Sequence, residues 1–163
     1  MGTGRFNTPD RTTYAAQSKT AQVLDSYGNT VTSQVYDYGN LSSPARTYSF
    51  QYLTASPYAQ RYIRNRVASS TVTASGATTT LTTNTYDGAG VTDRTGLTVH
   101  DYTPNLYRGN LTRSVTPGAI HNTAYDIGGL AVTGDDGQGH SVTIEPAANT
   151  NSSLPGAILP ARR

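Results

Sequence analysis

Three histidines, His100, His121 and His140, are the side chains of this 163-residue chain best suited to proton transfer near neutral pH. Combined with its serines and aspartates, they would supply the parts of a nucleophilic triad. No serine sits in a Gly-x-Ser-x-Gly frame, and the adjacent His100 and Asp101 would point to opposite faces of a strand. We therefore predict that the histidines are solvated or turn residues, His140 following a turn glycine, and that the chain is not an enzyme.

Asp135 and Asp136, in the sequence GDDGQGHS, are the candidates for a calcium loop. Calcium takes six or more oxygen ligands, usually from carboxylates at spaced positions. Two adjacent aspartates with no glutamate at the required distance fit a tight turn better. The chain has no cysteine, which excludes disulfides and cysteine-based metal sites. We predict neither a metal nor another cofactor.

The segment RYIRNR, residues 61–66, places three arginines and a tyrosine close together. It is either a small anion-binding or nucleic-acid patch, or a strand whose arginine stems pack along tyrosine rings with their heads in water. A net charge of +2 and a charged fraction of 13% are low for a nucleic-acid-binding protein. We favour the packed strand and expect no nucleic-acid partner. No apolar run approaches the roughly 18 residues of a membrane span.

The chain has twelve tyrosines and no tryptophan. Tyrosine joins a flat apolar ring to a polar hydroxyl, so exposed rings on a sheet would stack on sugars. Asn110 and Asn151 also stand in Asn-x-Ser/Thr sequences. A carbohydrate-binding β-module is therefore an alternative to a structural role. Binding requires tyrosines that converge in one groove with Asp or Asn at its rim, whereas a structural role requires a ladder on successive strands.

These side chains must be positioned by β-strands, because threonine (27 residues), tyrosine and valine dominate and good helix formers are scarce. Apolar or tyrosine positions alternate with small polar ones, as at Tyr48, Phe50 and Tyr52, which is typical of half-buried strands. Glycine-containing turns separate the runs. The sequence predicts an all-β fold, an antiparallel meander of β-hairpins with irregular termini. Its expected strands are 22–26, 30–38, 46–53, 61–75, 78–87, 96–102, 110–116, 121–127, 129–134 and 140–146.

The ends of the chain differ in composition from its middle. Residues 1–20 are polar with two early glycines and are interpreted as a flexible lead-in, with a strand in 11–20. Residues 21–145 carry the strand pattern. Residues 146–163 hold three prolines without alternation, so we interpret them as a disordered or truncated tail.

A short motif, Asp-x-x-Gly, recurs along the middle region and is usually preceded by tyrosine. In each copy we expect Asp to begin a turn by accepting a backbone N–H, and Gly to supply the positive φ. The leading tyrosine would lie on the sheet with its hydroxyl reaching water or a neighbouring strand. Full copies lie at Asp25–Gly28, Asp87–Gly90, Asp126–Gly129 and Asp136–Gly139; Asp37–Gly39 is one residue short, and Tyr107–Asn110 keeps the glycine without the acid.

The stretch YDIGGLAVTGDDGQGHSVTI, residues 125–144, resembles the RHS/YD-repeat family, whose unit reads Tyr-Asp-x-x-Gly-x-Leu followed by a second Asp-x-x-Gly. YDYGNL (36–41) and YDGAGV (86–91) resemble further copies, so the resemblance covers about residues 21–145. It implies a segment of a curved YD-repeat sheet. The repeat-framework positions are Tyr36, Asp37, Gly39, Tyr86, Asp87, Gly90, Tyr125, Asp126, Gly129, Asp136 and Gly139.

Members of that family use a long antiparallel sheet, spiralled into a shell, to enclose a toxic polypeptide or as an extracellular scaffold. The resemblance implies a non-enzymatic, secreted or cell-surface bacterial segment of a toxin-associated encapsulating or surface-display shell. Its partners would be other repeats of a larger chain or a self-associating copy, with a polypeptide cargo or a glycan as ligands. The family's Asp-Pro-x-Gly self-cleavage motif is absent, the spacing of copies is irregular, and the chain is too short to close a shell alone.

Overall fold

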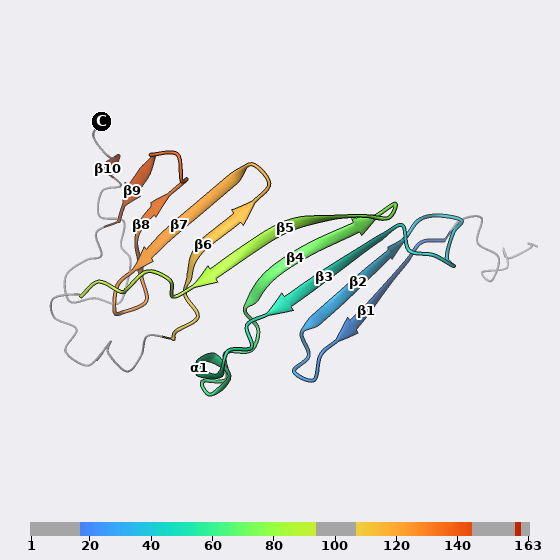
Figure 1. The fold of residues 1–163 in the computed structure, drawn as a ribbon, viewed down its shortest axis with the longest axis horizontal. Helices are drawn as coiled ribbons and strands as arrows, with labels where there is room; N and C mark the ends of the chain where they lie inside the picture. Colours follow the sequence, from blue (N-terminus) through green and yellow to red (C-terminus); the bar gives the residue numbers. More distant parts are fainter. Residues whose placement is uncertain (1–16, 94–106, 145–158, 161–163) are drawn as a thin grey trace, which may run out of the picture.

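The computed structural model describes residues 17–93, 107–144 and 159–160, and nearly all of its regular structure is β-strand (Figure 1). One short helix, α1, interrupts the strands between β3 and β4. The elements are β1 (Lys19–Leu24), β2 (Thr30–Tyr36), β3 (Arg46–Tyr52), α1 (Ser56–Ala59), β4 (Val67–Ala74), β5 (Ala77–Tyr86), β6 (Leu111–Thr116), β7 (Ala119–Tyr125), β8 (Ala131–Asp135), β9 (Ser141–Thr143) and β10 (Leu159–Pro160).

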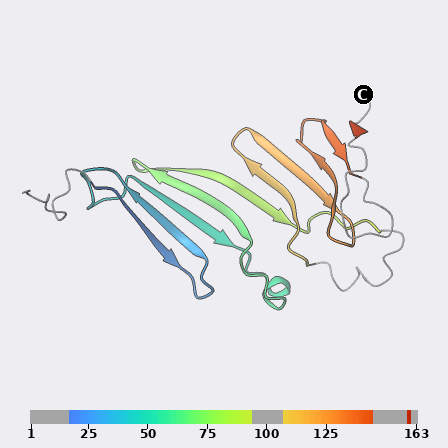
Figure 2. The ribbon, with the colours of Figure 1, turned by 180° about the vertical axis from the view of Figure 1, so that it is seen from behind.

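The strands form one antiparallel sheet in which each strand lies beside its neighbours in sequence, from β1 to β10 (Figures 1 and 2). This arrangement is the predicted meander of hairpins. The sheet is open, with β1 at one edge and β10 at the other. We call the side where β1, β3, β5 and β7 end the turn end of the sheet; it runs along the lower side of Figure 1.

The sheet is a single layer, and α1 lies beyond the ends of β3 and β4 rather than over a face (Figures 1 and 2). Among the described residues the buried hydrophobic side chains are therefore few, namely Tyr36, Tyr58 and Ile127. Domains usually bury one sheet face against a second layer. Here hydrogen bonds of strand backbones and side chains must carry much of the order that a core normally supplies.

Threonine pairs across β4 and β5 illustrate how polar residues stabilise this sheet. Thr73 lies directly opposite Thr78, and their hydroxyl oxygens are 2.8 Å apart. Such cross-strand pairs contribute a few tenths of a kcal/mol up to about 1 kcal/mol each. The same two strands are joined by a two-residue turn, Ser75–Gly76, with φ values of 50° and 80°. Positive φ at both positions is the conformation that matches the twist of a hairpin.

A register shift marks the end of each of β1, β3, β5 and β7. The shifts fall just before the last residue of the strand, at positions 23/24, 51/52, 85/86 and 124/125. A bulge increases local twist and re-aims the side chain that follows it. In β3, β5 and β7 the re-aimed residue is a tyrosine.

These terminal tyrosines form a ladder along the turn end. Each donates its hydroxyl hydrogen to the backbone carbonyl of the first residue of the preceding strand, at distances of 2.9–3.1 Å. Two of the framework tyrosines, Tyr86 and Tyr125, therefore reach a neighbouring strand, whereas Tyr36 donates to the Gln34 side chain of its own strand. The three bonds run from Tyr52 to Thr30, from Tyr86 to Val67 and from Tyr125 to Leu111.

One sequence-based expectation needs correction, and three others lie wholly or mostly outside the described residues. Residues 61–66 are not a strand. Helix α1 is followed by a tight turn at Tyr62, which has a φ of 59°, and β4 begins only at Val67. The strand expected at 96–102 lies outside the described residues. So do the lead-in up to residue 16 and most of the tail at 146–163, of which β10 alone is described.

Removing one ladder hydroxyl tests its contribution to stability. We predict that Tyr86→Phe and Tyr125→Phe each lower the free energy of unfolding by about 1 kcal/mol, because a part-buried hydrogen bond to a strand carbonyl is lost. Urea unfolding followed by circular dichroism measures the change. Tyr38→Phe is the matched control, since the Tyr38 side chain is 73% exposed and should be neutral. Equal stability of all three variants would contradict the ladder.

Candidate functional site

The turn between β1 and β2, residues 25–29, is built around the carboxylate of Asp25. The N–H of Asp25 donates to the carbonyl of Asn29 at 2.8 Å, and the N–H of Asn29 returns a bond of 2.9 Å to Asp25 Oδ1. Gly28 takes the left-handed conformation, with a φ of 84°. This reciprocal pair closes the turn, and the Asn29 amide adds a 2.8 Å bond to Asp25 Oδ2. That side-chain bond, together with bonds from the backbone N–H groups of Asn29 and Tyr27, lowers the pKa of Asp25.

Two further Asp-x-x-Gly copies have the same geometry. Asp126 exchanges backbone and carboxylate bonds with Leu130, both 2.9 Å long, and Gly129 has a φ of 83°. Asp136 does so with His140 at 3.2 Å, and Gly139 has a φ of 95°. Three separate turns therefore share one hydrogen-bond scheme in which Asp and Gly have fixed roles.

The fourth copy is divided between two distant segments. Asp87 donates its N–H to the carbonyl of Asn110 at 2.9 Å, and Asn110 returns a bond of 3.0 Å to Asp87 Oδ1. Asp87 Oδ2 also accepts the N–H groups of Arg108 and Gly109 at 2.9 and 2.7 Å. Asp87 is thus the acid of a turn whose other half is Tyr107–Asn110. The remaining residues of the β5–β6 connection are inserted between the two halves.

Gly109 is the glycine of this divided turn, with a φ of 73°. The interpretation of Gly90 as a turn glycine is wrong, because Gly90 does not adopt a positive φ and lies in open space. Gly90 satisfies the sequence spacing from Asp87, but the carboxylate binds amides more than twenty residues away in sequence. Tyr86, directly before Asp87, keeps its ladder role.

The copy at residues 36–40 departs from the scheme in another way. Gly39 has the expected positive φ of 79°, and Asn40 donates its N–H to the carbonyl of Asp37 at 3.2 Å. The Asp37 carboxylate is exposed and lies 3.9 Å from Arg46 in a loose ion pair. Tyr36 is buried beneath the Lys19 ammonium, 4.5 Å from its ring centroid. Asp37 therefore does not organise the turn as Asp25 does.

Loops at the turn end pack against one another beside the divided turn. Tyr58 of α1 is buried, donates to the carbonyl of Tyr86 at 3.2 Å and meets Tyr107 edge-on, with ring centroids 5.4 Å apart. Arg66 Nε donates to the carbonyl of Gly109 at 2.9 Å. The sequence did not single out Tyr58, and it marked Arg66 only as one of the three arginines of residues 61–66, without this contact.

The neighbouring turn, at Asp126, contains the most buried part of the described chain. Asp126 and Ile127 are each 2% exposed. Residue Thr92, from the β5–β6 connection, covers them: it donates its N–H to Tyr125 and accepts the N–H of Ile127, at 3.0 and 2.9 Å. Arg108 donates to the Ile127 carbonyl as well. The inserted segment therefore ties two successive turns together.

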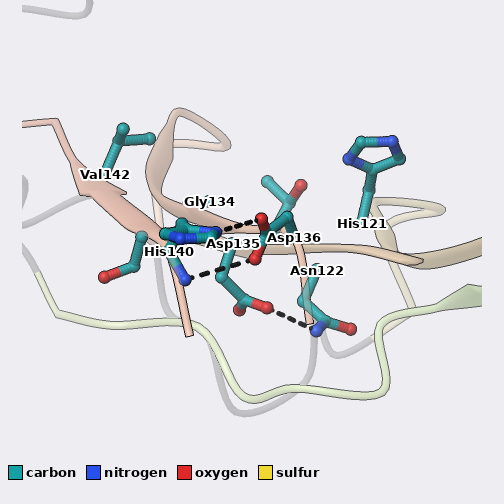
Figure 3. A pocket seen from close by; sticks show the side chains of 9 residues that line it. His121, Asn122, Gly134, Asp135, Asp136, His140 and Val142 are labelled. Atoms are coloured by element: carbon teal, nitrogen blue, oxygen red, sulfur yellow. Dashed lines mark hydrogen bonds and ion pairs between the residues drawn. The ribbon is translucent and has the colours of Figure 1, made fainter. Parts of the chain in front are cut away.

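A shallow hollow of about 360 Å³ lies over β7, β8 and β9 and holds the candidates for catalysis and metal binding (Figure 3). His140 Nδ1 lies 2.6 Å from Asp136 Oδ2, which confirms His140 as a turn residue. Hydrogen bonds from the His140 ring and from the N–H of Gln138 lower the pKa of Asp136 to about 2. His121 stands apart from this pair (Figure 3).

The two aspartates of the hollow are hydrogen-bonded to groups of the same turn and of β7. Asp135 Oδ1 accepts bonds from the Asn122 amide at 2.7 Å and from the Gly137 N–H at 2.9 Å. Both aspartates are therefore engaged within the chain, and no hydroxyl among the described residues is hydrogen-bonded to His140. Within the same residues no group of three acidic, histidine or cysteine side chains is placed to hold a metal ion. His100 lies outside the described residues.

No family model matches the chain, and no curated protein matches its sequence significantly. In the part of the chain that the structure describes, no helix has the length and apolarity needed to cross a membrane.

Alanine at three glycines tests which residues form the turns. Gly129→Ala should cost about 1–2 kcal/mol, because a side chain is strained at positive φ. Gly109→Ala should cost more, since a Cβ would also lie 2.9 Å from the Ile63 methyl carbon. Gly90→Ala should change the free energy of unfolding by less than about 0.5 kcal/mol. Chemical unfolding measures all three; a larger effect at Gly90 than at Gly109 would refute the divided turn.

The buried tyrosines predict a loss of stability in alkali. Burial, with the nearby Asp87 carboxylate, raises the pKa of Tyr58 to about 12, and burial also raises the pKa of Tyr52 and Tyr86. Each of these tyrosines ionises near pH 10 in the unfolded chain but only at higher pH in the folded chain. Its contribution to the free energy of unfolding is therefore complete below pH 10 and is lost as the pH rises, for Tyr58 between pH 10 and about 12. Thermal unfolding across this range should show a falling midpoint, and Tyr58→Phe should reduce the slope. A midpoint independent of pH would contradict this linkage.

Proposed function

We propose that this chain is a non-enzymatic structural segment of an RHS/YD-type protein, forming part of an encapsulating or surface-display shell associated with secreted toxins. The observation that carries the proposal is the repeated tyrosine–aspartate unit. Tyr86–Asp87 and Tyr125–Asp126 each follow a register shift, bond back to the preceding strand through tyrosine, and close a turn through aspartate. A unit that forms hydrogen bonds with the neighbouring strand can be repeated to extend the sheet, which suits it to the wall of a shell.

The single-layer architecture supports the same role. A sheet with few buried hydrophobic side chains is poorly suited to exist as a separate compact domain, whereas in a repeat array each unit is stabilised by the next. The ladder arrangement of Tyr52, Tyr86 and Tyr125 also favours a structural role over a sugar-binding groove for these rings, because their hydroxyls are occupied by backbone carbonyls. Secretion and cell-surface location remain expectations that come with the family resemblance.

The edge strand β1 offers a direct test. It pairs with β2 on one side, and no described strand pairs with its other side. Val23 and Leu24 on this strand are 56% and 55% exposed. Unprotected edges recruit further strands, and an added lysine blocks such pairing. In a wall, the next repeat would cover this edge.

We therefore predict that the chain self-associates at micromolar concentrations and that Val23→Lys lowers the association. Sedimentation velocity over a dilution series measures it. Val142→Lys is the control, since Val142 is also exposed but its strand, β9, is paired on both sides. A compact monomer at every concentration, with the unfolding cooperativity of a complete domain, would contradict the proposal.

The association with a shell is tested separately, by sequencing the coding region on both sides of these residues. The proposal predicts further Tyr-Asp units, an Asp-Pro-x-Gly segment and a variable C-terminal domain in the same reading frame. A reading frame without additional repeats would refute the association with a shell. It would remain compatible with a self-associating β-sheet protein.

A further inference from the structure

Arg64 lies between two exposed tyrosine rings at the turn end of the sheet. Its guanidinium carbon is 4.3 Å from the ring centroid of Tyr27, in the β1–β2 turn, and 5.4 Å from that of Tyr62, in the loop before β4. Tyr27 is 60% exposed and Tyr62 is 82% exposed. Stacking on aromatic rings holds a guanidinium in one plane and leaves its N–H edge available.

The backbone on both sides of this cluster is firmly held. The side-chain amide nitrogen of Asn29 donates to the Arg64 carbonyl at 3.0 Å and to Asp25 Oδ2 at 2.8 Å. These two bonds fasten the loop before β4 to the aspartate turn. Tyr62 has a φ of 59°, a conformation that costs energy for a bulky residue. Side chains are held at such cost most often in binding and active sites. Here the strained residue presents its ring to solvent.

The charge of Arg64 is not neutralised within the described chain. Neither described ion pair includes it, and its Nε is buried without an acceptor. The nearest aspartate of the turn, Asp25, is occupied by Asn29 and by the N–H of Tyr27. An arginine held in place without a carboxylate partner is a preformed receptor for one. It lies in an open hollow of about 310 Å³ lined by Tyr27, Asn29, Tyr62, Arg64 and Asn65.

We propose that this hollow binds an acidic sugar, a uronic-acid unit of a polysaccharide. The Arg64 guanidinium takes the sugar carboxylate through two parallel hydrogen bonds. The outer faces of the tyrosine rings provide flat apolar surfaces for the C–H face of the sugar ring, and the Asn65 side-chain amide nitrogen at the rim donates to one of its hydroxyls. The single arginine and the low net charge of +2 disfavour a polyphosphate such as nucleic acid.

This site stands apart from the tyrosine ladder, and the inference does not depend on the proposed function. Among the described residues, the hydroxyls of Tyr27 and Tyr62 bond to no strand carbonyl, in contrast to those of Tyr52, Tyr86 and Tyr125. These two sets of tyrosines therefore have different roles. Tyr52, Tyr86 and Tyr125 join strands, whereas Tyr27 and Tyr62 flank a cation at the surface.

Calorimetric titration of the full chain with oligogalacturonate, a uronic-acid oligomer, tests the inference. Binding should weaken about tenfold or more when the oligomer is methyl-esterified, because the ester removes the charge that Arg64 recognises. This comparison uses the unchanged protein, so it stands even if a variant fails to fold. Inorganic phosphate should bind much more weakly than the oligomer, since it lacks a ring to stack.

Variants then assign the binding to the hollow. Arg64→Gln should weaken binding of oligogalacturonate about tenfold or more, and Arg64→Lys should weaken it less, because lysine keeps the charge without the planar fork. Tyr62→Leu should weaken binding severalfold at unchanged thermal stability. Tyr38→Leu, at another exposed tyrosine, should have no effect. Absence of binding at millimolar oligomer, equal binding of the methyl ester or of phosphate, or insensitivity to Arg64→Gln and Tyr62→Leu would overturn the proposal.

Discussion

The fold depends on satisfying backbone N–H and carbonyl groups where strands end, because a single-layer sheet has little buried core to hold its edges in place. Unpaired backbone groups are costly wherever water is excluded. In this chain, side chains meet that requirement at the turn end. The carboxylate of an aspartate that follows one strand accepts the N–H of the residue just before the next strand. A tyrosine hydroxyl donates to the carbonyl of the first residue of the preceding strand.

The same type of backbone hydrogen bond closes four strand connections of very different length. The residue that follows β1, β3, β5 or β7 donates its N–H, at 2.8–2.9 Å, to the carbonyl just before the next strand. The pairs are Asp25 with Asn29, Leu53 with Arg66, Asp87 with Asn110 and Asp126 with Leu130. Because closing a longer loop costs little additional entropy, insertions between paired residues leave the sheet unchanged. They supply the surface where Tyr62 and Arg64 lie, consistent with the general tendency of loops on a regular scaffold to carry binding sites.

The strand pattern was predictable because alternation and glycine turns are local properties, and the turns at Asp126 and Asp136 are complete within five residues. The Asp87 turn was not predictable from spacing: Gly90 satisfied the motif locally, while the amides that Asp87 binds lie beyond a long insertion. The segment at 61–66 was mistaken for a strand because its arginine–tyrosine alternation matches period two. The positive φ of Tyr62 and the packing of Arg64 on Tyr27 arise from tertiary contacts that no local pattern encodes.

Amide hydrogen exchange, measured by NMR on the full chain, reports whether the Asp87 carboxylate closes the divided turn. We expect the amides of Arg108, Gly109 and Asn110, although they precede β6 in a connection, to be protected as strongly as those of β5 and β6, because the Asp87 carboxylate binds all three. Asp87→Ala, which removes both accepting oxygens, should abolish that protection selectively. Exchange of these amides at the rate of an unstructured peptide, with the strands still protected, would show that the Asp87 carboxylate does not hold this turn.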